Sequence, residues 1–247
     1  MTLSKCYSPV VRKQKMQKEG YTKLKDYRYE RKFVAPGLSR EEIETMIKMH
    51  PAMFSEIYHA RNVNNIYFDS LSLKNFFANI DGNQHRVKCR IRWYGELFGR
   101  IEKPILELKI KNGLMGKKES YLLPDFTLDR NFDIEMLRQA FRQADIPGIV
   151  GLDLASLQPA LLNRYTRKYF QTADRKYRIT VDTDLEYYRI HPNRNTFLHC
   201  SKDRDNIVIE LKYDKAGDPL AENISRSFPF RLSRNSKYVN GIHRLLM

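Results

Sequence analysis

The sequence places cations on every second residue of several strand-like segments. In residues 87–93 (VKCRIRW), the cations Lys88, Arg90 and Arg92 alternate with apolar residues. Successive side chains of a strand point to opposite faces, so the apolar residues of this segment share one face and the cations share the other. The apolar face must meet a core, and the segment is therefore predicted to be a strand with a cationic opposite face.

Other segments repeat the pattern with one carboxylate beside each cation. A Glu-x-Lys step occurs three times in similar apolar company, at Glu30/Lys32, Glu107/Lys109 and Glu210/Lys212. A single cationic row is usually a solvated face, since Lys and Arg are mostly exposed. Several such rows on one surface would repel one another unless a ligand or carboxylates neutralise them. The rows therefore indicate either a wet sheet face or a groove that holds a polyanion.

Net charge supports a polyanionic partner. The 247 residues carry a formal charge of +15, which predicts nucleic acid, a phosphate-rich ligand or an anionic membrane surface as partner. Residues 1–26 form a strongly basic arm that we expect to be flexible, and residues 27–247 form the body. The body is long enough to bury a sizeable core as one domain.

Cysteine usage and hydropathy indicate a cytoplasmic location. The three cysteines are odd in number and have no CxxC spacing, which is typical of a reduced intracellular protein. No apolar run approaches the roughly 20 residues that span a bilayer. The first 25 residues are polar and rich in Lys and Arg, so no secretory signal is expected.

The pattern of predicted elements favours an α+β fold. Ser39 and Glu42 form a capping box for a helix over residues 39–49. Further helices are predicted over residues 70–80, 133–144 and 236–246. Strands are predicted over residues 27–34, 65–69, 85–94, 104–111, 118–123, 161–171, 176–182, 186–190 and 206–213. Many strands on both sides of a helical insertion indicate a meandering antiparallel sheet or barrel rather than alternating βαβ units.

Common catalytic motifs are absent, which argues against a zinc enzyme and against an enzyme with a nucleophilic side chain. The sequence has no GxxxxGK[ST], HExxH or GxSxG, and its six histidines are scattered. Arg offers planar forks for phosphate oxygens, and Lys offers a point charge. Glu210 could hold a hard divalent metal on the same phosphates. Carboxylates that could assist it are Glu30, Glu107, Asp182 and Asp184.

The order of these segments resembles a known family. The series runs from Glu30-x-Lys32 through residues 65–70 (NIYFDS), 88–95 (KCRIRWYG), 107–109 (ELK), 165–167 (YTR), 178–182 (RITVD) and 210–212 (ELK) to 236–238 (SKY). This series resembles the VTC domain, the polyphosphate polymerase domain of the triphosphate tunnel metalloenzyme superfamily. The resemblance covers residues 27–247.

The resemblance implies an antiparallel β-barrel of about eight strands that forms a basic tunnel, with flanking helices and a C-terminal helix. It implies that Glu210 binds Mn or Mg and that ATP or another triphosphate is the substrate, with inorganic polyphosphate as the product. Residues that would grip phosphoryl groups are Lys32, Arg90, Arg92, Lys109, Arg167, Arg178 and Lys237. Residues that would assist binding are Lys88, Tyr165, Lys212 and Ser236.

One departure from the superfamily bears on the reaction. Its hydrolase and cyclase branches carry Glu-x-Glu-x-Lys on the first strand, whereas here Arg28 stands at the first of these positions. This favours the polymerase-like branch. The chain also lacks the regulatory SPX domain and the membrane segments of the eukaryotic complex, so membrane attachment would need a separate partner protein.

Two alternatives use the same residues differently. The first is an inorganic or nucleoside triphosphatase on the same fold, with water in place of the growing chain. The second is a non-catalytic module that binds RNA by counterion release, with tyrosines stacking on bases. Tyrosines beside the cations are Tyr94, Tyr165, Tyr169 and Tyr213, although their strand positions fit barrel packing better. We expect no nucleic-acid partner.

Overall fold

The computed structural model describes residues 29–112, 115–214 and 217–246. The basic arm and Arg28 lie outside these residues. Within the described part of the chain, no helix is long and apolar enough to cross a membrane.

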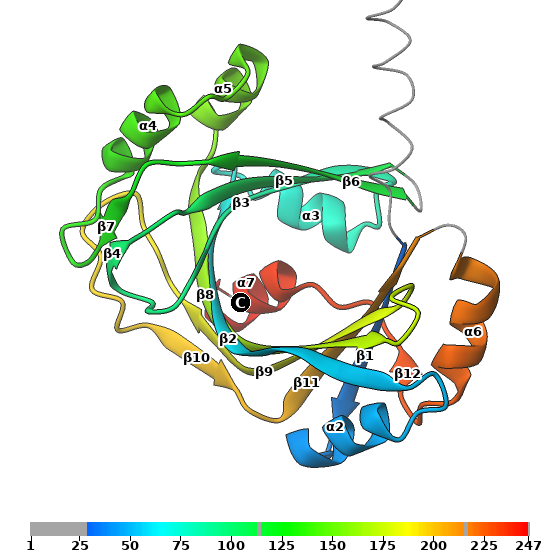
Figure 1. Cartoon of the computed structure of the whole chain (residues 1–247). Helices are drawn as coiled ribbons and strands as arrows, with labels where there is room; N and C mark the ends of the chain where they lie inside the picture. Colours follow the sequence, from blue (N-terminus) through cyan, green and yellow to red (C-terminus); the bar gives the residue numbers. More distant parts are fainter. Residues whose placement is uncertain (1–28, 113–114, 215–216, 247) are drawn as a thin grey trace, which may run out of the picture.

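A ten-stranded antiparallel sheet dominates the fold, and it curves strongly, so that one face lies on the inside of the curve (Figure 1). We call the region inside the curve, toward which the side chains of this inner face point, the enclosed space. Its strand order is β12-β1-β11-β9-β8-β2-β3-β5-β6, with β10 beside β9. The strands are β1 (Tyr29–Pro36), β2 (Phe54–Asp69), β3 (His85–Tyr94), β5 (Ile105–Asn112), β6 (Met115–Leu122), β8 (Gln158–Thr172), β9 (Arg178–Tyr188), β10 (Cys200–Asp203), β11 (Asn206–Tyr213) and β12 (Arg231–Leu232). A separate two-stranded sheet pairs β4 (Gly99–Ile101) with β7 (Phe126–Leu128).

Helices cover the outer face of the curved sheet in two places. Against β1, β9 and β11, helices α2 (Arg40–Lys48) and α6 (Asp218–Arg226) bury one apolar core. A second core lies between the outer side of β2, β3, β5 and β8 and helices α4 (Ile134–Gln143) and α5 (Gly148–Ala155). The predicted capping box starts α2, since Ser39 Oγ accepts from Glu42 N and Ser39 N donates to the Glu42 carboxylate.

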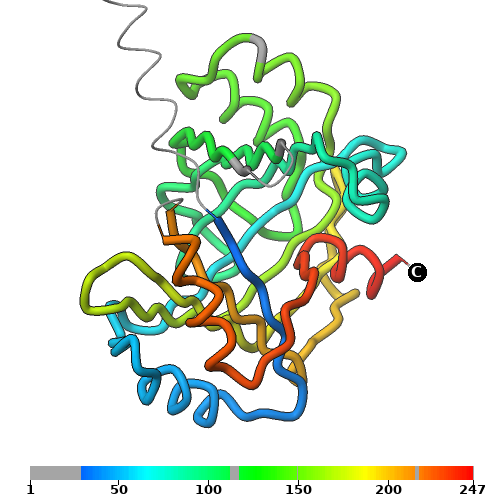
Figure 2. Tube along the Cα trace, turned by 90° about the vertical axis from the view of Figure 1, so that its right-hand side faces the viewer, coloured from blue at the N-terminus to red at the C-terminus, as the bar shows by residue number. Residues whose placement is uncertain are grey.

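Two further helices fill one end of the enclosed space. Helices α3 (Lys74–Ile80) and α7 (Lys237–Leu246) contact each other and pack on inward-facing residues such as Tyr67 and Leu161. Figure 2 shows them on the same side of the molecule. A side chain at Gly241 of α7 would lie 2.4 Å from Leu161 Cδ2 and 2.6 Å from Tyr187 Cδ1, so only glycine permits this close approach.

The structure confirms the antiparallel α+β fold and corrects two details. The sheet has more strands than the predicted eight, and its edge strands β6 and β12 do not pair within the described residues, so a hydrogen-bonded closed barrel is not formed there. Residues 176–182 and 186–190, predicted as separate strands, belong to the single strand β9. The apparent break comes from Asp184, which has a φ of 51° beside a register shift in the β8–β9 pairing.

Several elements were not predicted. They are the helices α5 and α6 and the short strands β4, β7, β10 and β12. The first half of β2 was also missed, because residues 54–62 are polar on both faces and show no apolar alternation.

Candidate functional site

Strand register places the alternating cations on the inner face. Residues directly opposite one another in an antiparallel pair project from the same face of the sheet. On one wall, Glu210 of β11 lies between Lys32 of β1 and Thr180 of β9, and Lys212 lies opposite Arg178. These residues face the enclosed space, since their neighbours in sequence form the outer core with α2 and α6.

We call this wall of β1, β9 and β11 the first wall. The facing wall, formed by β3, β5 and β6, is the second wall. Here Arg90 lies opposite Glu107, and Lys88 lies opposite Lys109. Glu107 is 4 % exposed and accepts both Arg90 Nε (2.8 Å) and Arg90 Nη2 (2.6 Å). Lys118 of β6 donates to the other oxygen of Glu107 at 2.9 Å. Burial alone would raise the pKa of Glu107, but the adjacent cations hold it well below its usual range.

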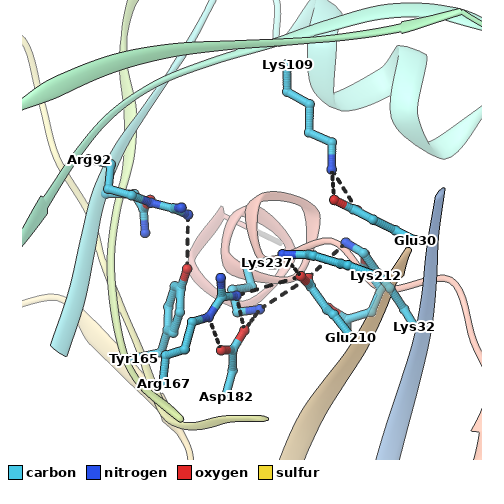
Figure 3. Close-up of polar contacts among 12 residues, drawn as sticks. Glu30, Lys32, Arg92, Lys109, Tyr165, Arg167, Asp182, Glu210, Lys212 and Lys237 are labelled. Carbon is cyan, nitrogen blue, oxygen red and sulfur yellow. Dashed lines mark hydrogen bonds and ion pairs between the residues drawn. The ribbon is translucent and has the colours of Figure 1, made fainter. Parts of the chain in front are cut away.

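Side chains bridge the two walls where backbone pairing does not. Strands β1 and β5 are far apart in the sheet order, yet Lys109 Nζ lies 2.7 and 2.8 Å from the two carboxylate oxygens of Glu30. Figure 3 shows this ion pair spanning the gap between the two strands. Burial opposes ionisation of Glu30, but Lys109 and the other nearby lysines lower its pKa to about 2. Charged side chains from several strands therefore border the enclosed space, as Figure 3 shows.

A buried charge cluster lies on β8, β9 and α7. Arg167 forms a two-pronged contact with Asp182, using Nε on one oxygen and Nη2 on the other (2.6 Å). Lys237 of α7 also contacts Asp182, and its Nζ lies 4.7 Å from the centre of the Tyr165 ring. Burial would raise the pKa of Asp182, but Arg167 and Lys237 lower it. Asp182 therefore stays ionised although it is fully buried.

Glu210 is the carboxylate with the most cationic surroundings on the first wall. Its oxygens lie 3.0 Å from Lys212 Nζ, 3.3 Å from Lys32 Nζ and 3.8 Å from Arg167 Nη2. Burial alone would raise its pKa, but these cations and Lys237 keep it well below its usual range. Figure 3 shows Glu210 at the centre of this group.

Arg92 of the second wall reaches toward the strands β2 and β8. Arg92 Nε donates to Asn65 Oδ1 (3.0 Å), and its Nη2 donates to the Tyr165 hydroxyl (3.1 Å). Burial would raise the pKa of Tyr165, but Arg167 and Arg92 lower it. The guanidinium of Arg92 is thereby held in a defined orientation across the strands β2 and β8.

Comparison with known protein families shows which family the chain belongs to. The profile of the VTC domain matches residues 27–246, which is most of the chain. The chain belongs to the VTC domain family. A comparison with curated proteins found no significant match.

Solved structures are similar to this chain at low sequence identity, and one of those compared has a TM-score above 0.5. The putative adenylyl cyclase HpAC1 from Hippeastrum is 12 % identical with a TM-score of 0.51, over 90 % of this VTC domain and 97 % of that chain. The PH1819 protein from Pyrococcus horikoshii is 15 % identical with a TM-score of 0.48, over 87 % of this chain and 96 % of its own. The Mimivirus capping enzyme triphosphatase is 10 % identical with a TM-score of 0.34, covering 90 % and 99 %.

The VTC domain brings every predicted site residue to one enclosed face, although their roles remain predictions. Asp184 does not join them, because its positive φ turns it outward and it is exposed. Tyr213, a predicted stacking candidate, packs in the outer core. Asp182 and Glu107 were expected only to assist Glu210 in holding a metal, but in the structure each forms ion pairs with two or more cations. Their alternation with the cations of the same strands was the available signal.

A metal in this VTC domain would need oxygens from its substrate. No group of three or more His, Cys, Asp and Glu side chains within the described residues could hold a metal ion alone. Glu210 with Glu30 beside it fits a different pattern, in which one or two carboxylates share Mg²⁺ or Mn²⁺ with phosphate oxygens. The ionised, buried state of Glu210 suits this pattern.

Lys88 carries an unusual charge state. Its Nζ donates to Ser236 Oγ at 2.8 Å, and no carboxylate within the described residues forms an ion pair with it. Burial and four surrounding cations lower the pKa of Lys88 to about 6. The pKa of an unfolded lysine is near 10.4, so between about pH 10 and pH 6 the folded protein binds fewer protons at Lys88 than the unfolded chain does. The free energy of unfolding therefore falls as the pH falls through this range.

A phosphate ligand is expected to reverse this shift. Bound oxyanions raise the pKa of Lys88, so tripolyphosphate binding at pH 8 should take up a proton and should strengthen as the pH falls. Isothermal titration calorimetry in buffers of different ionisation heat measures the uptake. On binding tripolyphosphate, Lys88→Met is expected to take up about one proton fewer than the unmodified protein. Protons gained or lost by the ligand itself are the same for both proteins and therefore drop out of this difference. Equal uptake by the two proteins would contradict the prediction.

Proposed function

We propose that this VTC domain is a metal-dependent phosphotransferase that adds the γ-phosphoryl group of ATP to inorganic polyphosphate. The supporting observation is the convergence of cations from both walls on one enclosed face, where they outnumber the carboxylates. Among the described residues, the inward cations include Lys32, Lys88, Arg90, Arg92, Lys109, Lys118, Arg167, Arg178, Lys212 and Lys237, and the inward carboxylates include Glu30, Glu107, Asp182 and Glu210.

This excess charge is suited to a phosphate chain. Like charges this close together in a protein interior are costly without anions, and a polyphosphate would supply them along its whole length. Arg90 and Arg92 would grip phosphoryl oxygens from the second wall, and Lys32 and Lys237 from the first. Lys109 would exchange Glu30 for phosphate oxygens.

The proposed chemistry needs positioning and neutralisation rather than a protein nucleophile. Phosphoryl transfer is accelerated mainly by aligning the reactants and stabilising charge on the phosphoryl oxygens. The terminal oxygen of the growing chain would attack the γ-phosphorus, and ADP would leave. Mn²⁺ or Mg²⁺, held by Glu210 and phosphate oxygens, would add charge neutralisation when bound.

A triphosphatase is the second candidate. Water can replace the chain end as the nucleophile in the same site. The published description of HpAC1, which shares the fold, reports a dominant triphosphatase activity for that protein. The two candidates differ in their product, since a triphosphatase releases free phosphate and a polymerase does not.

The deciding experiment measures both products from one reaction. Purified protein with Mn²⁺ and ATP is expected to form long polyphosphate and one ADP for each phosphoryl group added to a chain, with little free phosphate. Free phosphate without chain growth would support the triphosphatase instead. No turnover with any divalent metal, together with no stabilisation by tripolyphosphate, would contradict both. RNA of equal charge is expected to compete poorly with tripolyphosphate, and the reverse order would support the RNA-binding alternative.

Arg90→Ala is expected to abolish chain synthesis. Glu107 keeps Arg92 and Lys118 as partners in this variant, so the fold should persist. Arg226→Ala is the matched control, since Arg226 is exposed on α6 and its one ion pair among the described residues is with Glu222. Its activity is expected to equal that of the unmodified protein. Equal losses in the two variants would show that net charge, not position, is responsible.

A further inference from the structure

A group of aromatic rings surrounds one arginine at the end of the inner face away from α3 and α7. The guanidinium carbon of Arg61 on β2 lies 4.7 Å from the centre of the Tyr58 ring. It lies 5.9 Å from the Tyr94 ring on β3 and 5.9 Å from the Tyr169 ring on β8. Tyr58 and Tyr169 also meet edge to face, with their centres 5.6 Å apart. We call Arg61, Tyr58, Tyr94 and Tyr169 the aromatic cluster.

The aromatic cluster is open to solvent and lacks a carboxylate. Tyr58 is 47 % exposed and Tyr94 is 48 % exposed, so broad ring surface is accessible. Within the described residues, Arg61 has contacts with these rings but neither a hydrogen bond nor an ion pair. Arg167, its neighbour across the β2–β8 pairing, is by contrast held by Asp182.

Position links the aromatic cluster to the proposed phosphate site. The Arg167 guanidinium lies 5.1 Å from the Tyr165 ring and 6.0 Å from the Tyr169 ring, so Tyr169 is shared between Arg167 and Arg61. Tyr94 follows Arg92 by two residues on the same face of β3, a rise of about 7 Å. Cations and rings therefore continue without interruption from the interior to this end of the sheet.

We propose that the aromatic cluster binds the base of the nucleoside triphosphate whose phosphates lie among Arg92 and Arg167. This inference rests on the proposed function and adds the position of the nucleoside. Bases stack on tyrosine rings and on guanidinium planes, whereas a bare phosphate chain gains nothing from three phenol rings. Stacking accepts any base, so purine and pyrimidine triphosphates should both bind, purines more tightly because their rings are larger.

The test compares ATP with inorganic tripolyphosphate, which has the phosphates without a base. Binding of each to the full-length protein is measured by calorimetry for the unmodified protein, Tyr94→Ala, Tyr58→Ala and Tyr94→Phe. We expect each alanine variant to bind ATP roughly 10-fold more weakly and tripolyphosphate unchanged. Tyr94→Phe keeps the ring and should retain ATP affinity. Melting temperatures confirm that the half-exposed positions tolerate substitution.

The remaining outcomes overturn the inference in distinguishable ways. Equal losses for ATP and tripolyphosphate would mean that the rings only shape the phosphate site. Unchanged affinity for both ligands would mean that the base lies elsewhere, while the proposed function would stand. Failure of the unmodified protein to bind either ligand would overturn the proposed function together with this inference.

Discussion

Replacing Arg167 with alanine is expected to destabilise the free protein by about 3–5 kcal/mol, because it leaves the buried Asp182 carboxylate without its main partner. For a chain of this length the melting temperature should fall by about 6–20 °C. Tripolyphosphate is expected to raise the melting temperature of this variant less than that of the unmodified protein, since one of the proposed phosphate-binding guanidinium groups is gone. Differential scanning calorimetry with and without tripolyphosphate measures both effects.

A double variant separates the two roles of Arg167. Adding Asp182→Asn to Arg167→Ala removes the buried charge that Lys237 would otherwise have to balance without Arg167, and should recover part of the lost stability. It should not recover stabilisation by tripolyphosphate. A melting temperature of Arg167→Ala within about 2 °C of the unmodified protein would contradict the expected cost of removing Arg167 from the buried carboxylate.

Replacing Glu210 with glutamine is expected to change catalysis and binding in opposite directions. Loss of the metal-holding carboxylate should lower metal-dependent turnover by roughly 10²–10³-fold. Tripolyphosphate should bind more tightly in the absence of metal, because a negative charge has left a group of four cations. Steady-state kinetics over a range of Mn²⁺ concentrations, with calorimetry in a chelator, measures both effects.

Glu107→Gln is the matched control for charge. It removes one carboxylate from the opposite wall, where Glu107 contacts Arg90, Arg92 and Lys118. This control should also bind tripolyphosphate more tightly, but its half-saturating Mn²⁺ concentration should not change. An unchanged Mn²⁺ requirement in Glu210→Gln would place the metal elsewhere.

Much of the inner lining could be predicted because alternation is a local property. The apolar residues beside Lys88, Arg90 and Arg92 had to face a core, so the cations had to face away from it. The same reasoning held for Lys32 and Lys212, and the structure places all of them on one face.

Local alternation failed where the strand itself is irregular. Asp184 was grouped with Asp182 by counting residues, but a positive φ at Asp184 shifts the register and turns it to solvent. Arg61 was overlooked because both faces of β2 are polar there, so no periodicity marked a strand. The rings around Arg61 come from three strands, and no sequence spacing relates them.

Which side chains share a face follows from the amino-acid sequence alone, because the two-residue period of a strand depends only on neighbours along the chain. The order of the charged segments likewise indicates the family. The contacts of Glu30 with Lys109 and of Lys237 with Asp182 are known only from the folded chain. Those contacts depend on how far the sheet curves and where α7 docks, and both follow from packing between residues distant in the chain.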